Sequence, residues 1–517
     1  MLRGARVGTE TVSLSRTGNG WLLSGSGGLG APFDVITTRF EAAYGTDWQP
    51  ARLLVQGSVK GEAMSLATTF GLTTAMNDLT QGTRRGSTSH QIPSRSVVLP
   101  SGFFAAYEGL AARLVNATVG TRVPVYVAPE GDTSVTVDRI AHRRVSLGDR
   151  ALDLQIFSLA LASTGGRSLI ELWIDSRGRL ARLEISEIAV VVIRDDLASV
   201  MARTEHVRHP GDEDVFIPAN GFSLGATFTR PANPTEGAAA IVLVSGPGPQ
   251  DRDFTSYGVP IFGQLAGALA DADYFVLRYD GRGVGRSGGR TENATIEQYA
   301  DDVVRAVSWI KRRDDIDDRR IAVLGYAEGG PVVMLAAARE SDIKAVAVVG
   351  APGRSGREVT IEQQLYLLSR MNLPDAERSA RTALQYRIID AAMTGTGWET
   401  IPPDVRSQAD SAWFRSWLLF EPAAVLRRMD QPVLIVHGAL DKETPPAHAD
   451  RLATLSSQRN ENRPEYTSQV IIPGINHLLV PAETGEVDEY DTLETLAVSP
   501  AVSAAIAEWL GEMLPPR

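Results

Sequence analysis

Two different hydrophobic patterns divide the chain near residue 200. Before that point, short stretches alternate apolar with polar positions or carry β-branched residues, and turn formers separate them. Such a period of two between glycine-rich turns is typical of antiparallel strands. We therefore predict a mostly antiparallel, β-rich N-terminal domain over residues 1–203. The clearest strand patterns are Ser96–Leu99, Val123–Val127, Leu152–Ile156 and Ser168–Ile174, and the turn signals include Gly18–Gly20, Gly27–Gly28 and Gly165–Gly166.

A second pattern follows a polar linker and an expected hairpin within residues 204–234. From residue 241, short and almost wholly apolar stretches alternate with helical ones such as 297–312 and 499–513. Buried apolar strands that alternate with helices indicate a parallel sheet covered on both faces. We predict a doubly wound, mostly parallel α/β domain over residues 204–517. Its strands are expected at Ile241–Val244, Phe275–Leu277, Ile321–Leu324, Val346–Val349, Val433–Val436 and Val470–Ile472.

A helical cap is expected between two of these strands. The spacing lengthens after Val346–Val349, and residues 355–428 carry only helix-like pattern. Ligands of open α/β sheets bind outside the carboxyl ends of the strands, so an insertion there would cover the binding site.

The candidate chemistry begins where the strand Ile321–Leu324 meets a helical stretch at Pro331–Ala338. The turn between them reads Gly325-Tyr326-Ala327-Glu328-Gly329-Gly330. A strand, a tight turn with glycine two positions either side of its centre, and a helix form the setting of the G-x-S-x-G nucleophile elbow. Alanine stands where that motif has serine, and alanine has no nucleophilic atom.

An acid and a base follow later strands in the order that this motif requires. Asp441 comes after Val433–Val436, and His477 comes after Val470–Ile472. Nucleophile, acid and base in that chain order are the arrangement of α/β-hydrolases. A single loop histidine carries little weight, but three positions in order at three strand ends favour a catalytic site. In it, Asp441 would hold the imidazole of His477 in the tautomer that accepts a proton.

The second domain resembles a bacterial subfamily of α/β-hydrolase esterases. The likeness rests on the elbow and on three further segments, Ser245–Asp253, Leu277–Ser287 and Ser411–Arg415 with Glu421-Pro422. It implies a carboxylic ester hydrolase that needs no cofactor or metal, with serine at position 327 and with Asp441 and His477 completing a triad. We interpret Ala327 as a deliberate Ser→Ala inactivation. A natural, non-catalytic ligand-binding protein and a serine peptidase or amidase are the alternatives.

The oxyanion hole is the second departure from the family pattern. It needs backbone N–H groups from the residue after the nucleophile and from the loop after the first central strand. Glu328 supplies the first. Pro247 stands where relatives often carry serine, and proline has no N–H, so Gly248 or a neighbour is expected to donate instead.

Other motifs in the chain have simpler structural explanations. Gly283–Gly288 matches G-x-G-x-x-G, but the next helix is expected only near Thr295, which argues against a dinucleotide site. His206 and His209 lack further metal ligands nearby. Glu443 is an alternative acid, and Asp251 and Asp253 beside Arg252 suggest a structural ion-pair network.

Large apolar side chains in the cap suggest the substrate. Trp413 and Trp417 are the candidate binding residues, which favours a small-molecule ester with an apolar or aromatic part. Aromatic stripes at helical spacing are also common in packing between elements.

Composition narrows the class of protein further. The chain has 517 residues, a net charge of -11 and no cysteine, which argues against nucleic-acid binding and redox chemistry. We find no apolar run long enough to span a membrane, and no signal-peptide pattern at the start. Bacterial cytoplasm and periplasm both fit, and the oligomeric state is not indicated.

Overall fold

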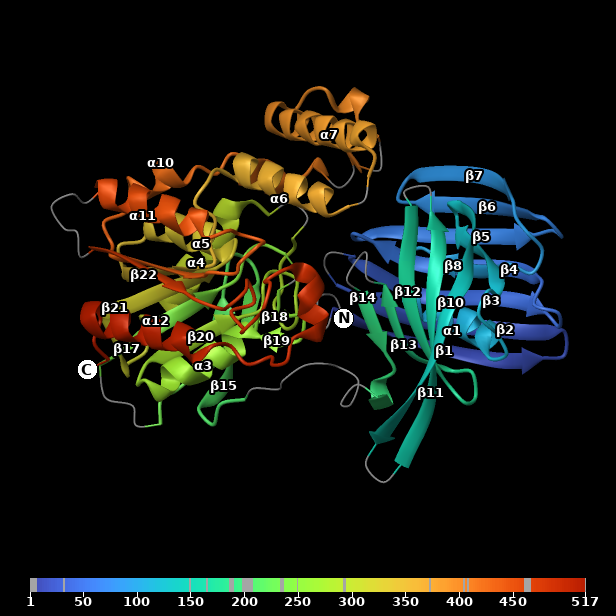
Figure 1. Ribbon diagram of the computed structural model, residues 1–517, viewed down its shortest axis with the longest axis horizontal. Helices are drawn as coiled ribbons and strands as arrows, with labels where there is room; N and C mark the ends of the chain where they lie inside the picture. The colour runs from blue at the N-terminus through green and yellow to red at the C-terminus, as the bar shows by residue number, and fades with distance from the viewer. Residues whose placement is uncertain are drawn as a thin grey trace. The chain divides into compact units, whose positions relative to one another are not determined.

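The chain forms two compact units, Met1–Arg203 and Thr204–Arg517. The computed structural model describes residues 7–30, 33–147, 150–163, 166–185, 190–197, 208–232, 237–248, 250–291, 294–371, 373–402, 405–406, 409–459 and 466–516. Each unit has its own hydrophobic core. Figure 1 shows both units, with strands prevailing in the first.

The first unit begins with a seven-stranded antiparallel meander. Each strand pairs with the next in sequence, so the order in the sheet is the order in the chain. Gly27 and Gly28 lie inside the second strand, so the prediction of a turn at these two residues is wrong. A Cβ on Gly27 would come within 2.6 Å of the Cα of Glu10, which means that the paired backbone leaves no room for a side chain. The strands are β1 (Gly8–Thr17), β2 (Gly20–Leu29), β3 (Val35–Gly45), β4 (Pro50–Val59), β5 (Glu62–Phe70), β6 (Thr74–Gln81) and β7 (Arg84–Gln91).

A second seven-stranded sheet completes this unit. Its pairs are antiparallel except for β8 with β9, and the helix α1 (Tyr107–Leu114) contributes Leu110 and Leu114 to the shared core. The turn expected at Gly165–Gly166 lies partly outside the described residues. The strands are β8 (Val97–Pro100), β9 (Arg122–Ala128), β10 (Gly131–Leu147), β11 (Arg150–Ser163), β12 (Gly166–Asp175), β13 (Leu180–Ile185) and β14 (Val190–Ile193).

The second unit is built on an eight-stranded sheet with the order β15-β16-β20-β17-β21-β22-β23-β24. The pairs from β20 to β24 are all parallel, and the hairpin β15–β16 adds two antiparallel strands at one edge. The strand order reverses at β17, because the next strand of the sheet, β20, pairs on one side of β17 and the following strand, β21, pairs on the other. The strands are β15 (Asp212–Pro218), β16 (Ser223–Thr229), β17 (Ala238–Val244), β20 (Phe275–Tyr279), β21 (Ile316–Tyr326), β22 (Ile343–Val349), β23 (Val433–Gly438) and β24 (Thr467–Ile472).

Helices cover both faces of this sheet and bury two separate clusters of apolar side chains. On one face lie α3 (Ile261–Asp271) and α12 (Pro500–Met513), and on the other lie α4 (Ile296–Ile310), α5 (Gly329–Ala337) and α11 (Ala447–Arg459). Every residue of β17, β20 and β23 is buried, as a sheet covered on both faces requires. The predicted fold class is therefore confirmed.

Helices also fill the long connection between β22 and β23. α6 (Gly356–Arg370) packs against α7 (Asp375–Thr394) and α9 (Ala412–Leu418), and α10 (Pro422–Leu426) leads back to the sheet. Ser355 caps α6 by accepting the N–H of Glu358, whose carboxylate accepts the N–H of Ser355 in return. Figure 1 shows α6 and α7 stacked at one end of this unit. Among the described residues, no helix is long and apolar enough to cross a membrane.

Candidate active site

A strained residue marks the turn between β21 and α5. Ala327 has φ of 50°, in the left-handed region that non-glycine residues rarely enter. Its N–H donates to the carbonyl oxygen of Val349 at 2.9 Å, and its own carbonyl accepts the N–H of Gly330 at 3.0 Å. The turn thus keeps a backbone strain that is common at functional sites, around a side chain with no reactive atom.

Three glycines let the strand, the helix and the neighbouring loop meet at this turn. A Cβ on Gly325 would lie 2.2 Å from the carbonyl oxygen of Gly329, and one on Gly329 would lie 2.2 Å from that of Val244. A Cβ on Gly246 would lie 2.7 Å from the Cβ of Glu328. These contacts explain why glycine occupies all three positions, and they place the loop after β17 directly against the elbow.

The structure brings Asp441 and His477 together. Nδ1 of His477 and Oδ2 of Asp441 lie 2.7 Å apart, and Oδ1 of Asp441 accepts the N–H of Thr444 at 2.8 Å. Both residues follow the carboxyl ends of neighbouring parallel strands, β23 and β24. Gly438 allows the two loops to approach, because a Cβ there would lie 2.6 Å from the carbonyl oxygen of Ile475.

The pair adjoins the elbow. The phenol of Tyr326 donates to the carbonyl oxygen of His477 at 2.6 Å, and the two rings lie 5.3 Å apart. Gly350, directly after β22, also faces the pair: a Cβ on it would lie 3.6 Å from both Oδ2 of Asp441 and Nδ1 of His477. The residues at the ends of β21, β22, β23 and β24 therefore enclose one centre.

The electrostatics of the pair favour an ion pair. Burial lowers the pKa of His477, but Asp441, Glu443 and Glu328 outweigh it and raise that pKa to about 10. Burial raises the pKa of Asp441, but His477 and His437 outweigh it and bring that pKa down to about 2. At neutral pH the imidazole is thus protonated and the carboxylate ionised.

A second histidine, His437, also contacts Asp441, a contact that the sequence analysis did not predict. It lies on β23 and is fully buried, with Nε2 at 2.5 Å from the carbonyl oxygen of Thr444 and 3.3 Å from Oδ2 of Asp441. A histidine in a buried strand is usually a core residue. Its spacing of four before Asp441 was the available signal.

The amides proposed for an oxyanion hole lie on the two segments that meet here. Glu328 precedes α5, and we find no acceptor for its N–H in the described part of the chain. Gly248 has φ of 128° and accepts the N–H of Gln250 at 2.9 Å. A Cβ on Gly246 would meet Glu328, whereas one on Gly248 would not, so the second donor remains a prediction.

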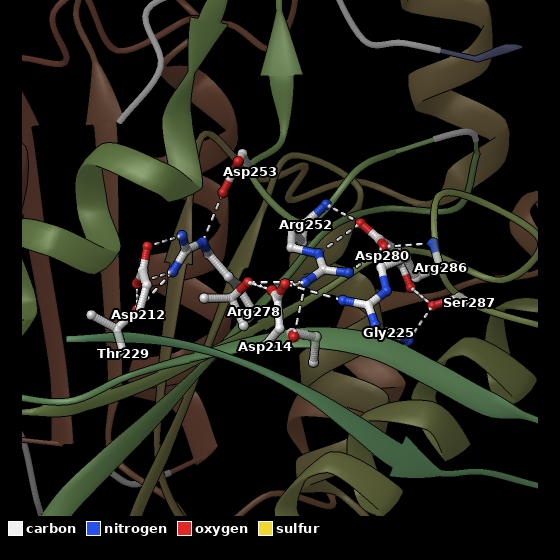
Figure 2. A network of polar contacts seen from close by, with 12 residues as sticks. Asp212, Asp214, Gly225, Thr229, Arg252, Asp253, Arg278, Asp280, Arg286 and Ser287 are labelled. Atoms are coloured by element: carbon white, nitrogen blue, oxygen red, sulfur yellow. Dashed lines mark hydrogen bonds and ion pairs between the residues drawn. The ribbon is translucent and has the colours of Figure 1, made fainter. Parts of the chain in front are cut away.

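An ion-pair network anchors the loop after β17 (Figure 2). Arg252 binds Asp280 through Nη2 at 2.8 Å and Asp214 through Nη1 at 2.9 Å. The neighbouring Arg278 binds Asp212 at 3.0 Å and Asp253 at 2.8 Å. These bonds tie the loop to β20 and to the hairpin β15–β16. Asp251 makes no ion pair with the residues that the structure describes: it accepts the N–H of Thr255, and burial raises its pKa to about 6.

The two tryptophans expected to bind substrate belong to the cap. Trp417 is buried, and its Nε1 donates to the hydroxyl of Thr360 on α6 at 3.0 Å. Trp413 is partly buried and lies 5.7 Å from Trp417 between ring centroids. Both pack with the core cluster of the α4–α5 face, whereas Ala327 belongs to the cluster of the other face. Packing within the cap accounts for both, and a role in binding stays a prediction.

Glu443, the alternative acid, does not contact Nδ1 of His477 in the structure. Glu443 accepts the hydroxyl of Tyr490 at 2.8 Å, while Asp441 occupies the position beside Nδ1 of His477. The glycines of residues 283–288 form a loop, and α4 begins only at Ile296. His209 contacts Asp271 at 3.4 Å, and His206 lies outside the described residues.

Comparison with known families agrees with this geometry. Residues 259–383, which include the elbow, match the family described as serine aminopeptidase, S33. This match covers part of the second unit and shows a similarity to that family. The matched segment runs from β19 (Val259–Pro260) into α7, so it covers the elbow but neither Asp441 nor His477.

Proteins similar in sequence to this chain include an esterase. Esterase EstD of Thermotoga maritima is 26% identical over 300 residues, which cover 58% of this chain and 67% of EstD. An uncharacterized 31.7 kDa protein of Escherichia coli is 24% identical over 200 residues, which cover 36% of this chain and 70% of that protein. The solved structure of Est1E from Butyrivibrio proteoclasticus with ferulic acid is 20% identical, with a TM-score of 0.38, and covers 58% of this chain and 98% of its own.

Proposed function

We propose that the second unit is a carboxylic ester hydrolase of the serine type, present here in a form inactivated by alanine at position 327. The observation that carries the proposal is the pair His477–Asp441, joined at 2.7 Å beside an elbow whose central residue keeps φ of 50°. The similarity to an esterase supports the hydrolysis of ester bonds rather than of another kind of bond.

The proposed reaction uses the chain's own groups in two steps, once serine stands at position 327. Nε2 of His477 takes the hydroxyl proton as the serine oxygen attacks the ester carbonyl carbon. The N–H of Glu328 stabilises the oxyanion, and the C–O bond breaks as His477 returns the proton to the alcohol. Water, deprotonated by His477 in turn, attacks the acyl-serine and releases the acid.

The protonation of His477 sets the expected pH dependence. Only the neutral imidazole can take the serine proton, and the surrounding carboxylates hold the pKa of His477 well above its usual value. Ester hydrolysis by the serine form should therefore rise as the pH increases above neutrality.

Ala327→Ser is the deciding experiment. We expect this variant to hydrolyse p-nitrophenyl butyrate and to be labelled by a fluorophosphonate, while the alanine protein does neither. Ala336→Ser, the same change within α5 rather than in the turn before it, serves as the control and should stay inactive. A folded Ala327→Ser variant without hydrolysis or labelling would show that the proposal is wrong.

Two alternatives have their own readouts. The match to serine aminopeptidases favours peptide hydrolysis as the second candidate, in which case Ala327→Ser would cleave amino-acid p-nitroanilides faster than p-nitrophenyl esters. The alanine itself favours a ligand-binding protein without catalysis. A serine codon at position 327 in the source gene would exclude that reading, and an alanine codon would support it.

A further inference from the structure

The buried histidine on β23 makes contacts that a core residue does not need. Nε2 of His437 faces two acceptors, the carbonyl oxygen of Thr444 at 2.5 Å and Oδ2 of Asp441 at 3.3 Å. A carbonyl oxygen can only accept, so Nε2 must carry a proton. Nδ1 is buried and has no hydrogen-bond partner among the described residues, so a proton there would be left unsatisfied. Of the two tautomers, the geometry thus selects the one with its proton on Nε2.

That N–H closes a small ring of bonds around Asp441. The N–H of Thr444 donates to Oδ1 of Asp441 at 2.8 Å, while the carbonyl of the same residue accepts from His437. Oδ2 is left to receive Nδ1–H of His477 at 2.7 Å, with His437 approaching from the other side. Each oxygen of the carboxylate is therefore fixed, and the carboxylate cannot rotate without breaking a bond to a buried group.

We propose that His437 is a positioning residue, which holds the carboxylate of Asp441 in the orientation that serves His477. This inference rests on the proposed function for its catalytic meaning, but the contacts themselves exist in the alanine protein. Removing the N–H of His437 frees both Asp441 and the carbonyl of Thr444 to shift. The bond to His477 then weakens, and so does the attraction that keeps its imidazole protonated.

Other charged and titratable groups surround His437 and His477 and could also influence Asp441. Glu443 and Glu328 act on His477 together with Asp441, and Tyr326 bonds its carbonyl. On the far side, His448 of α11 lies close enough to His437 to interact with it electrostatically. None of these groups bonds to Asp441 in the described part of the chain, so His437 and Thr444 alone orient it toward His477.

A matched pair of buried amides separates positioning from packing. In His437→Gln the side-chain amide reaches about as far as Nε2 and can still donate, whereas in His437→Asn it is too short. We expect the pKa of His477, followed by NMR of its ring in the alanine protein, to fall by about one unit or more in the Asn variant. In the Gln variant it should stay near the parent value. An unchanged or higher pKa in His437→Asn would refute the positioning role.

The same pair in the Ala327→Ser background tests the catalytic consequence. His437→Asn should lower kcat about tenfold or more with KM within twofold, and should move the acidic limb of kcat/KM to lower pH. His437→Gln should restore both. If Ala327→Ser itself is inactive, the proposed function is wrong. The pKa of His477 in the alanine protein would still show whether His437 positions Asp441.

One measurement needs no variant and covers the case in which both substitutions prevent folding. The chain has seven histidines, few enough for their ring nitrogens to be assigned by NMR. We expect the ring of His437 to carry a proton on Nε2, which faces the carbonyl oxygen of Thr444. A ring protonated on Nδ1 alone would contradict the inference.

Discussion

The phenol of Tyr326 donates a hydrogen bond to the carbonyl oxygen of His477 at 2.6 Å, from the position directly before Ala327. Both residues are buried, and burial raises the pKa of Tyr326 well above its usual value, so the phenol remains a donor throughout the accessible pH range. The turn around Ala327 therefore holds the loop that carries His477 through the side chain of Tyr326. This bond involves no atom of the Ala327 side chain, so it does not depend on which residue stands at position 327.

Tyr326→Phe should destabilise the second unit. The substitution leaves a buried carbonyl without its donor, which costs about 1–3 kcal/mol. We expect that loss in urea unfolding of the full chain followed by tryptophan fluorescence. Tyr279→Phe is the control, because we find no hydrogen bond from the hydroxyl of Tyr279 among the described residues, and it should change little. Equal stability of the two variants would mean that the bond to His477 contributes nothing.

Ala327→Gly should stabilise the protein. Alanine at φ of 50° bears a left-handed strain of about 1–2 kcal/mol that glycine avoids, and the greater freedom of glycine in the unfolded chain offsets part of the gain. We expect a net increase of about 0.5–1 kcal/mol in the free energy of unfolding.

The control for this change is Ala336→Gly, at an alanine on α5 that is also buried. There the backbone is helical, so the same substitution should destabilise by about 1 kcal/mol. Opposite signs for the two glycines identify strain at the elbow. A loss of stability at both positions would mean that the turn does not force Ala327 into its left-handed conformation.

The arrangement of the site was predictable where a local motif reports it. The glycines around Ala327 and the strand ends before Asp441 and His477 are visible in the sequence, because strand-end loops and close backbone contacts restrict residue type locally. The contacts of His437, by contrast, depend on how a buried strand faces the loop that follows it. Trp417 shows the same limit: its helical spacing predicts an apolar face, but not whether that face meets ligand or the neighbouring helix. The glycines at Gly27 and Gly28 misled for a related reason, since close pairing within a sheet selects glycine as strongly as a turn does.

The pair His477–Asp441 should make stability depend on pH at both ends. The depressed pKa of Asp441 contributes stability above its usual 3.8, which is lost as the pH falls toward about 2. The raised pKa of His477 contributes stability that is complete below 6.5 and is lost as the pH rises toward about 10.

Asp441→Asn isolates this contribution. The free energy of unfolding of the parent should exceed that of the variant most between pH 4 and 6.5, and the difference should narrow in both directions. The pKa of His477 should fall in the variant, which NMR titration would measure. A difference in stability that stays constant from pH 4 to 10 would show that the two groups do not form an ion pair.

Arg252 should be among the most costly single residues to replace in the second unit. Asp280 is 4% exposed and accepts both Nε and Nη2 of Arg252, so Arg252→Met leaves a buried carboxylate without its cation. Breaking a buried pair in this way costs about 3–5 kcal/mol. Arg252→Lys should recover only part of the loss, because an ammonium cannot bond Asp280 and Asp214 with the same planar fork.

The control for Arg252 is Arg319→Met, at an ion pair with Asp317 in which the arginine side chain is 83% exposed. That change should cost below about 1 kcal/mol. The double variant Arg252→Met with Asp280→Asn should be less destabilised than the sum of its two single variants, since it removes both charges together. Additive losses would contradict a direct pairing.

The same network joins the loop after β17 to β20, so Arg252→Met in the Ala327→Ser background should also lower ester hydrolysis by loosening the segment that contacts Glu328.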